Sequence, residues 1–337
     1  MQLQKIGLIS IFLLCAIIAN QYKYKTYYES SIETTLPLEQ MNMVKEPNPL
    51  QIDILDKSDP WVKQMLKDIK KEDWLADKEK VKVQKLEGDF IGDKNIDQIW
   101  ALTGEHQKET LFLLYENYKG KYQYRSFLEV FGEVKEIKKL AIRGVQKDLL
   151  LIKEYINELL GAFEESTRIK AYDWREKKPT IVLDIIEDYH AYWNELWDHK
   201  KPKNESHWLQ IVQHSDVQWQ DELYPVLHVI SHQVFSTSKA TDQVDMPKEE
   251  DFQIQKTKEI KRDYRWDPSW NGFILAEGID TQTGEKVAIL EDLSDTPFTL
   301  VGFVEDAYRI KRKNGSIEEV PKGKIHMEGG KKELQVS

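Results

Sequence analysis

From about residue 81 onward, short apolar runs alternate with turn-forming residues, and this pattern constrains the fold more than any other feature. The strongest turn signal is Asn314-Gly315, which separates Ala307–Lys311 from Ile317–Val320 and is typical of a tight β-hairpin. A second turn, 267–272, joins a run beginning at Phe252 to one beginning at Phe273, and a third joins the run ending at Ile279 to Lys286–Leu290. Consecutive hairpins predict an all-β protein built as a meander.

The middle of the chain allows two interpretations. Residues of 149–197 such as Ile152, Ile156 and Leu159 recur at helical spacing, which would make the fold α+β with helices in this region. Thr180–Ile186 is rich in β-branched residues, and Thr167–Trp174 tends to alternate. The composition favours strands here, and the helical alternative stays open.

The N-terminal 25 residues predict a signal peptide or a membrane anchor. An apolar run from Ile6 to Ala19 follows Lys5, close enough to Met1 for either function. The only cysteine, Cys15, lies inside this run, so the rest of the chain has no disulfide framework and no thiolate metal site. We expect an extracytoplasmic protein, facing outward from the cell membrane or secreted if the segment is cleaved.

Beyond this segment, the pattern predicts a linker, a helix, a large β-rich domain and a tail. Residues 26–57 contain three prolines and no sustained periodicity, as a linker would. In 58–80, Asp59-Pro60 and the apolar spacing that follows predict one short helix. Residues 81–320 form the β-rich domain, and the Gly- and Lys-rich 321–337 predict a flexible tail.

The net charge and the motifs reduce the number of function classes that fit the sequence. With 48 basic and 58 acidic residues the net charge is −10, which disfavours nucleic acid as a partner. The sequence has no nucleophile elbow, phosphate-binding loop or dinucleotide fingerprint. Paired carboxylates, Glu164-Glu165 or Asp184 with Asp188, would suit glycosidic acid/base chemistry, but 58 acidic residues produce such pairs by chance.

One acidic stretch resembles a metal-binding loop. "GDFIGDKNID", residues 88–97, is similar to the calcium loop of FG-GAP-like (VCBS-type) repeats, in which each repeat supplies one blade of a β-propeller. The resemblance covers one loop and implies a propeller-like domain with ligands Asp89, Asp93, Asn95 and Asp97. It departs from the family pattern at Ile91, where a ligand is missing, and at Lys94, where a glycine normally allows the sharp turn.

These departures weaken the case for a bound ion. Calcium prefers six to eight oxygen ligands, and the loop lacks one of its usual donors. The preferred interpretation is a structural turn whose acidic residues accept local hydrogen bonds, with calcium as the alternative and no other cofactor expected.

Histidines and tryptophans are the remaining candidate binding groups. His228 and His232 share one face of the chain and would allow a zinc site, although no metalloprotease glutamate stands between them. Ten tryptophans are present, and Trp193, Trp197, Trp266 and Trp270 form a candidate aromatic binding face for a sugar or a partner protein.

These features predict a membrane-tethered or exported, non-enzymatic binding or scaffold module that recognises a protein or a glycan at the cell surface. The alternative is an envelope polysaccharide hydrolase or a metal-dependent hydrolase. The absence of catalytic motifs favours the binding module.

Overall fold

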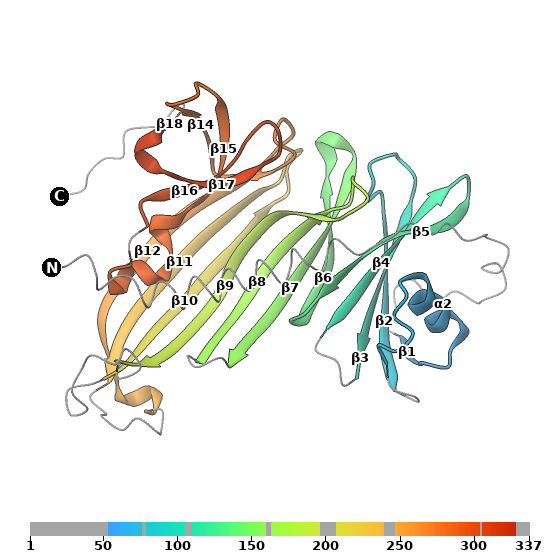
Figure 1. Ribbon diagram of the computed structural model, residues 1–337, viewed down its shortest axis with the longest axis horizontal. Helices are drawn as coiled ribbons and strands as arrows, with labels where there is room; N and C mark the ends of the chain where they lie inside the picture. The colour runs from blue at the N-terminus through green and yellow to red at the C-terminus, as the bar shows by residue number, and fades with distance from the viewer. Residues whose placement is uncertain are drawn as a thin grey trace.

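The computed structural model describes residues 53–75, 79–105, 109–159, 163–195, 207–238, 247–303 and 305–327. Within these residues the protein is all-β with one short α-helix, as the hairpin pattern predicts. The predicted N-terminal segment, 1–25, lies outside the described residues. The strands form three antiparallel sheets, which we call sheets A, B and C in chain order (Figure 1).

Sheet A has five strands in sequential order, all antiparallel. They are β1 (Asp53–Asp56), β2 (Lys80–Gly88), β3 (Asp97–Gly104), β4 (Thr110–Tyr118) and β5 (Lys121–Val130). The helix α2 (Pro60–Asp68) begins where the Asp59 carboxylate accepts the backbone N–H groups of Trp61 and Val62. Its apolar side packs on one face of sheet A around the buried Trp100.

At this end of the chain, the structure differs from the predicted bounds of the linker and of the helix. The predicted linker, 26–57, ends earlier than expected, because Asp53–Asp56 pairs with β2 as an edge strand. Among the described residues of 58–80, the predicted helix occupies Pro60–Asp68.

Sheet B has eight strands, also in sequential order, and curves into a half-barrel (Figure 1). Its strands are β6 (Glu133–Ile142), β7 (Lys147–Leu159), β8 (Phe163–Asp173), β9 (Thr180–Asn194), β10 (Trp208–Gln220), β11 (Val226–Ser238), β12 (Phe252–Asp267) and β13 (Gly272–Ile274). Two 3₁₀ turns, η2 (Arg143–Val145) and η5 (Glu249–Asp251), precede β7 and β12. The described residues of 149–197 lie mainly in β7, β8 and β9, and none of them is in an α-helix, so the helical alternative is wrong.

The apparent helical spacing in this region has a physical cause. Alternate residues of β7 face opposite sides, so Leu149 faces the concave interior of sheet B whereas Leu150 and Ile152 pack against sheet A. Because β7 packs on both faces between Leu149 and Ile152, this stretch is apolar at every position and lacks the simple alternation of a half-exposed strand.

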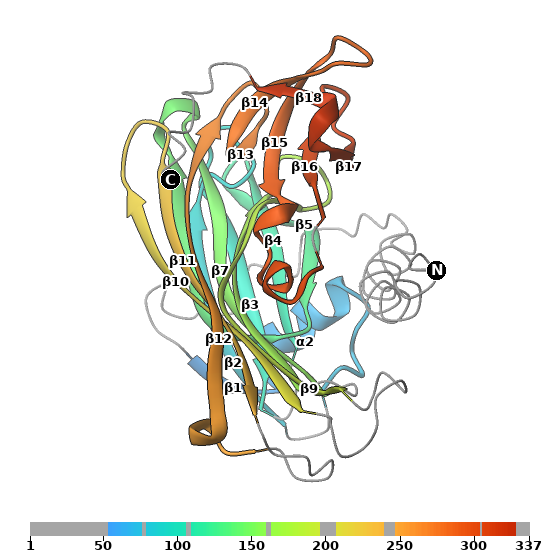
Figure 2. The ribbon, with the colours of Figure 1, turned by 90° about the vertical axis from the view of Figure 1, so that its left-hand side faces the viewer.

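Sheet C has five strands in the order β17-β16-β15-β14-β18 and lies near one end of sheet B (Figures 1 and 2). Its strands are β14 (Ala276–Asp280), β15 (Lys286–Asp292), β16 (Ala307–Lys311), β17 (Ile317–Pro321) and β18 (Ile325–Met327). The 3₁₀ turns are η6 (Leu293–Asp295), η7 (Pro297–Val301) and η8 (Lys322–Lys324). The predicted hairpin around Asn314-Gly315 joins β16 to β17.

The predicted flexible tail, 321–337, needs a correction. Pro321 ends β17, and Ile325–Met327 forms β18, which pairs with β14. Residues 328–337 lie outside the described part of the chain. No repeat of propeller blades is identified among the described strands, which instead follow one another in long meanders.

Candidate functional site in the concave face of sheet B

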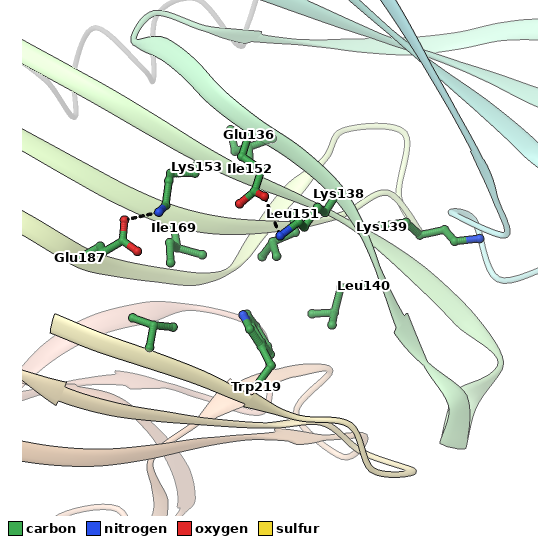
Figure 3. A pocket seen from close by; sticks show the side chains of 11 residues that line it. Glu136, Lys138, Lys139, Leu140, Leu151, Ile152, Lys153, Ile169, Glu187 and Trp219 are labelled. Atoms are coloured by element: carbon green, nitrogen blue, oxygen red, sulfur yellow. Dashed lines mark ion pairs between the residues drawn. The ribbon is translucent and has the colours of Figure 1, made fainter. Parts of the chain in front are cut away.

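A pocket of about 330 Å³ opens in the concave face of sheet B (Figure 3). Figure 3 shows Leu140, Leu151 and Ile169 on one side of this pocket and Trp219 on the other. The complete lining is Glu136, Lys138, Lys139, Leu140, Leu151, Ile152, Lys153, Ile169, Glu187, Val217 and Trp219. The volume is at the lower end of the range found for ligand sites in proteins.

The strand pairing explains why space remains here. Strand β9 pairs with β10 from Asn194 opposite Trp208 to Asp188 opposite His214, and no further pairing between these strands is made. Glu187 on β9 and Val217 on β10 lie just beyond the last pair, and both line the pocket. The pocket therefore forms where the two strands diverge.

Charged residues surround the apolar lining as ion pairs. Lys153 Nζ lies 2.6 Å from Glu187 Oε2, and Lys138 Nζ lies 2.6 Å from Glu136 Oε1. Lys139 turns away from the pocket, and its Nζ donates to the carbonyl oxygen of Glu87 at 3.0 Å (Figure 3). The result is a pocket with an apolar interior and a charged rim, at which two of the three lysines are paired with the two glutamates.

Contacts with neighbouring aromatic rings hold the Trp219 ring in place. It contacts Phe273 edge to face, with 5.8 Å between ring centroids, and Phe273 contacts Trp266 in the same way at 5.5 Å. Trp219 is half-buried, so part of its ring remains available in the pocket. A rigid, partly exposed indole is a common anchor for a bound partner.

The predicted calcium loop brings its three aspartates together. Ligand atoms of Asp89, Asp93 and Asp97 lie within 4.8 Å of one another. Asp89 Oδ1 accepts the backbone N–H of Gly92 at 2.6 Å, and its Oδ2 accepts that of Lys94 at 2.9 Å.

The other two aspartates also accept hydrogen bonds within or beside the loop. Asp97 Oδ2 accepts from Phe90 N at 3.1 Å, and Asp97 Oδ1 accepts from Asn117 N at 3.1 Å. The Asn95 amide donates to Asp93 Oδ2 at 2.9 Å. Each aspartate therefore has a structural role without an ion.

The donor set fits calcium poorly. The cluster offers three carboxylates, Ile91 supplies no side-chain donor, and calcium prefers six to eight oxygens. Burial, with a smaller effect of the Asp93 and Asp89 charges, raises the pKa of Asp97 to about 6 against the hydrogen bonds from Asn117 and Ile91. The geometry favours the structural turn, and calcium binding stays a prediction.

The predicted aromatic face needs a correction. Trp266 and Trp270 are only 2% and 3% exposed, so neither presents its ring to a partner. Trp270 Nε1 donates to Glu277 Oε1 at 2.7 Å, which satisfies its polar atom in the interior. Trp193 is half-buried beside Tyr189 and Ile211, and Trp197 lies outside the described residues.

The two predicted histidines do not meet. His228 and His232 both lie on the exposed side of β11, but a separation of four residues along a strand is roughly 13 Å. His228 instead contacts Asp263 and Gln220 through its two ring nitrogens, at 2.7 and 2.9 Å. The proposed His228–His232 metal pair is therefore not formed.

Asp184 and Asp188, one of the carboxylate pairs noted in the sequence, each contact a basic side chain. The Asp184 carboxylate accepts from Arg168 Nε at 2.9 Å, and Asp188 contacts His214. Sequence reasoning missed the pocket, including Trp219, Lys153 and Glu187, because its residues come from five strands of sheet B. No local motif connects these residues.

No protein-family model, curated protein or solved structure matches this chain. Among the described residues, no helix is both long enough and apolar enough to cross a membrane. The fold and the pocket thus define the chain as an antiparallel β protein with a concave, apolar candidate site.

Proposed function

We propose that the chain is a non-enzymatic binding module, held outside the cytoplasm or exported by its N-terminal segment, that binds a segment of a partner protein in the concave pocket of sheet B. The observation that carries this proposal is the pocket itself: an apolar lining with one partly exposed tryptophan and two ion pairs at its rim. Such a site accepts an apolar side chain, and the rim charges can pair with polar groups on either side of it.

A protein segment fits this pocket better than a glycan does. Leu140, Leu151 and Ile169 offer no hydrogen-bonding side-chain atoms, and a sugar ring buried against them would lose bonds from its hydroxyl groups to water. The rim lysines are already engaged by Glu187 and Glu136, so they are poorly placed to compensate. A glycan would have to rely on Trp219 alone.

The hydrolase alternative has less support. The two carboxylates that line the pocket, Glu136 and Glu187, are each paired with a lysine at 2.6 Å. A carboxyl group that serves as acid or base must exchange a proton with substrate, and each of these would first have to break its ion pair.

The test is selection of a displayed random-peptide library on the immobilised full-length chain, followed by affinity measurement on three variants. We expect the selected peptides to carry an apolar anchor and to lose at least tenfold in affinity for Leu140→Lys and Trp219→Ala. Ile254→Lys is the matched control, because Ile254 is an exposed apolar residue of β12, 67% accessible, outside the pocket.

Peptides that bind all variants equally would overturn the proposal. A glycan array probed in parallel separates the two ligand classes. The pocket would be a sugar site instead if glycans bind the wild type but not Trp219→Ala and if the library yields no binding peptide.

A further inference from the structure

Four titratable side chains form a row across four neighbouring strands on the exposed face of sheet B. The strand register places Asp188 of β9 opposite His214 of β10, His214 opposite His232 of β11, and His232 opposite Glu259 of β12. All four side chains are between 44% and 62% exposed. Because directly opposed residues of antiparallel strands have neighbouring side chains, this row is built into the register of the sheet.

Each histidine of the row has its Nδ1 nitrogen beside a carboxylate. His214 Nδ1 lies 2.6 Å from Asp188 Oδ1, and His232 Nδ1 lies 3.6 Å from Glu259 Oε2. The other Glu259 oxygen pairs with Lys261 at 3.0 Å. The hydrogen bond from Asp188 favours the His214 tautomer that carries its proton on Nδ1 and leaves Nε2 as an electron-pair donor, whereas Glu259 contacts His232 at ion-pair distance.

The two Nε2 nitrogens converge on a third group. Asp216 follows His214 by two residues in β10 and therefore points to the same face. His214 Nε2 lies 4.0 Å from Asp216 Oδ1, and His232 Nε2 lies 3.8 Å from Asp216 Oδ2. Two imidazoles, from neighbouring strands, thus approach the two oxygens of one carboxylate.

This set of groups has the chemistry of a transition-metal site. Two histidines and one carboxylate, with the fourth position left to water, are typical of open zinc sites. Metal bonds of 2.0–2.2 Å in tetrahedral geometry place ligand atoms about 3.3 Å apart. The two Nε2 atoms lie 4.0 and 3.8 Å from different oxygens of Asp216, so the three side chains have to rotate before one ion can contact all of them. All three side chains are exposed, which leaves room for rotation about their side-chain bonds.

We propose that His214, His232 and Asp216 form a surface site for a divalent cation of the zinc class, with Asp188 and Glu259 orienting the two imidazole rings. The site is independent of the proposed peptide pocket. Val217 and Trp219 of β10 face the concave interior, whereas His214 and Asp216 alternate with them and face outward.

The test is calorimetric titration of zinc into the chelator-stripped full-length chain, together with cobalt absorption spectra. We expect one zinc equivalent to be lost in His214→Ala and in His232→Ala, or its affinity to fall at least tenfold. The visible bands of bound cobalt should decrease in parallel. Asp188→Asn should weaken zinc binding by about 10-fold to 100-fold, because it removes a group that orients a ligand.

His228→Ala is the matched control. His228 lies on the same strand and the same face as His232, but its ring nitrogens are engaged by Asp263 and Gln220. This variant should bind zinc as the wild type does. Zinc binding that survives both His214→Ala and His232→Ala, or that falls equally with His228→Ala, would overturn the proposal. Asp93→Ala identifies any zinc held by the acidic loop, and the strand signal in circular dichroism shows that each variant is folded.

Discussion

At the scale of single residues, Lys94 occupies a backbone conformation that suits glycine. Its φ angle is 72°, in the left-handed region that disfavours side chains with a Cβ atom. We therefore predict that Lys94→Gly raises the free energy of unfolding by about 1 kcal/mol, despite the greater flexibility of glycine in the unfolded chain. Urea denaturation in the presence of chelator measures this change.

Lys82→Gly is the control for this prediction. Lys82 is exposed on β2, in extended backbone, so glycine has no conformational advantage there and should lower stability by about 1 kcal/mol. Equal losses in the two variants would show that the left-handed conformation of Lys94 is not a source of strain.

A second residue-scale prediction concerns Asp68, at the last position of α2. Burial raises its pKa above 3.8, against hydrogen bonds from the Tyr115 hydroxyl at 2.6 Å and the Gln64 amide at 2.7 Å. The folded state therefore binds the Asp68 proton more tightly than the unfolded state. The resulting stability is complete below pH 3.8 and is lost as the pH rises through the folded pKa.

Comparison with Asp68→Asn isolates this contribution, because the variant has no proton to lose. Urea unfolding of both proteins between pH 4 and pH 8 should show the wild type losing stability relative to the variant as the pH rises. A difference that stays constant across the range would mean that the Asp68 proton affinity is the same in the folded and unfolded chains.

At the scale of elements, the attachment of β18 depends on Gly278. A Cβ atom added there would lie 2.6 Å from Ile325 Cγ2 and 3.2 Å from the carbonyl oxygen of His326, both in β18. We predict that Gly278→Ala lowers the free energy of unfolding by about 1–3 kcal/mol, as overpacking of a tight contact does. Thermal melts followed by circular dichroism test this change.

Two further variants show whether the contact with β18 is responsible. Gly323→Ala, where a Cβ would meet nothing within 4 Å, should leave the melting temperature unchanged. Adding Ile325→Ala to Gly278→Ala should give less loss than the two single changes predict together. Strict additivity would place the cause of the Gly278 effect elsewhere.

The turns between elements also depend on a buried ion pair. Lys147, at the start of β7, contacts Asp173 at the end of β8, and both side chains are at most 2% exposed. Asp173 also accepts from Arg175 N at 2.8 Å and from the Asn271 amide at 3.0 Å, which attaches the β12–β13 turn. The pair therefore connects three strand ends.

We predict that Lys147→Met lowers the free energy of unfolding by about 3–5 kcal/mol, because it leaves the Asp173 carboxylate buried without its cation. The double variant Lys147→Met/Asp173→Asn should recover a large part of this loss, and a double-mutant cycle from urea unfolding measures the recovery. A double variant as unstable as the sum of the single changes would show that the charge pairing is not the cause.

The elements could be predicted from the sequence to different degrees. The hairpin around Asn314-Gly315 was predictable because residues that favour positive φ specify the turn locally, and Gly315 has a φ of 87°. The start of β7 was ambiguous because burial on both faces between Leu149 and Ile152 removes the alternation that distinguishes strands from helices. Strand β18 was missed because three residues among glycines and lysines carry no periodic signal.

At the scale of the whole molecule, the candidate sites depend on register and curvature, which no local pattern encodes. The sequence identified His228 and His232, whereas the register instead places His232 opposite His214, 18 positions away. The pocket likewise forms where β9 and β10 diverge, and its walls come from residues as distant as Leu140 and Trp219. Both arrangements follow from long-range pairing across a sheet that curves on itself.

The same long-range packing predicts that sheets A and B unfold together. A shared cluster joins Phe112 and Ile99 of sheet A to Leu150 and Ile152 of sheet B, and all four are fully buried. Phe112→Ala should therefore lower the free energy of unfolding by about 3–5 kcal/mol. This variant should increase amide hydrogen exchange in β7 and β8 as well as in β3 and β4, because both sheets pack against the same cluster.

Ile289→Ala provides the comparison for hydrogen-exchange mass spectrometry. Ile289 is buried in the separate cluster of sheet C, with Val287 and Ile310, so its truncation should first increase exchange in β14 to β18. If Phe112→Ala increased exchange in β3 and β4 and left β7 and β8 unchanged, the two large sheets would be independent units. In that case the curvature of sheet B, and with it the concave pocket, would have to be maintained by sheet B and its contacts with sheet C alone.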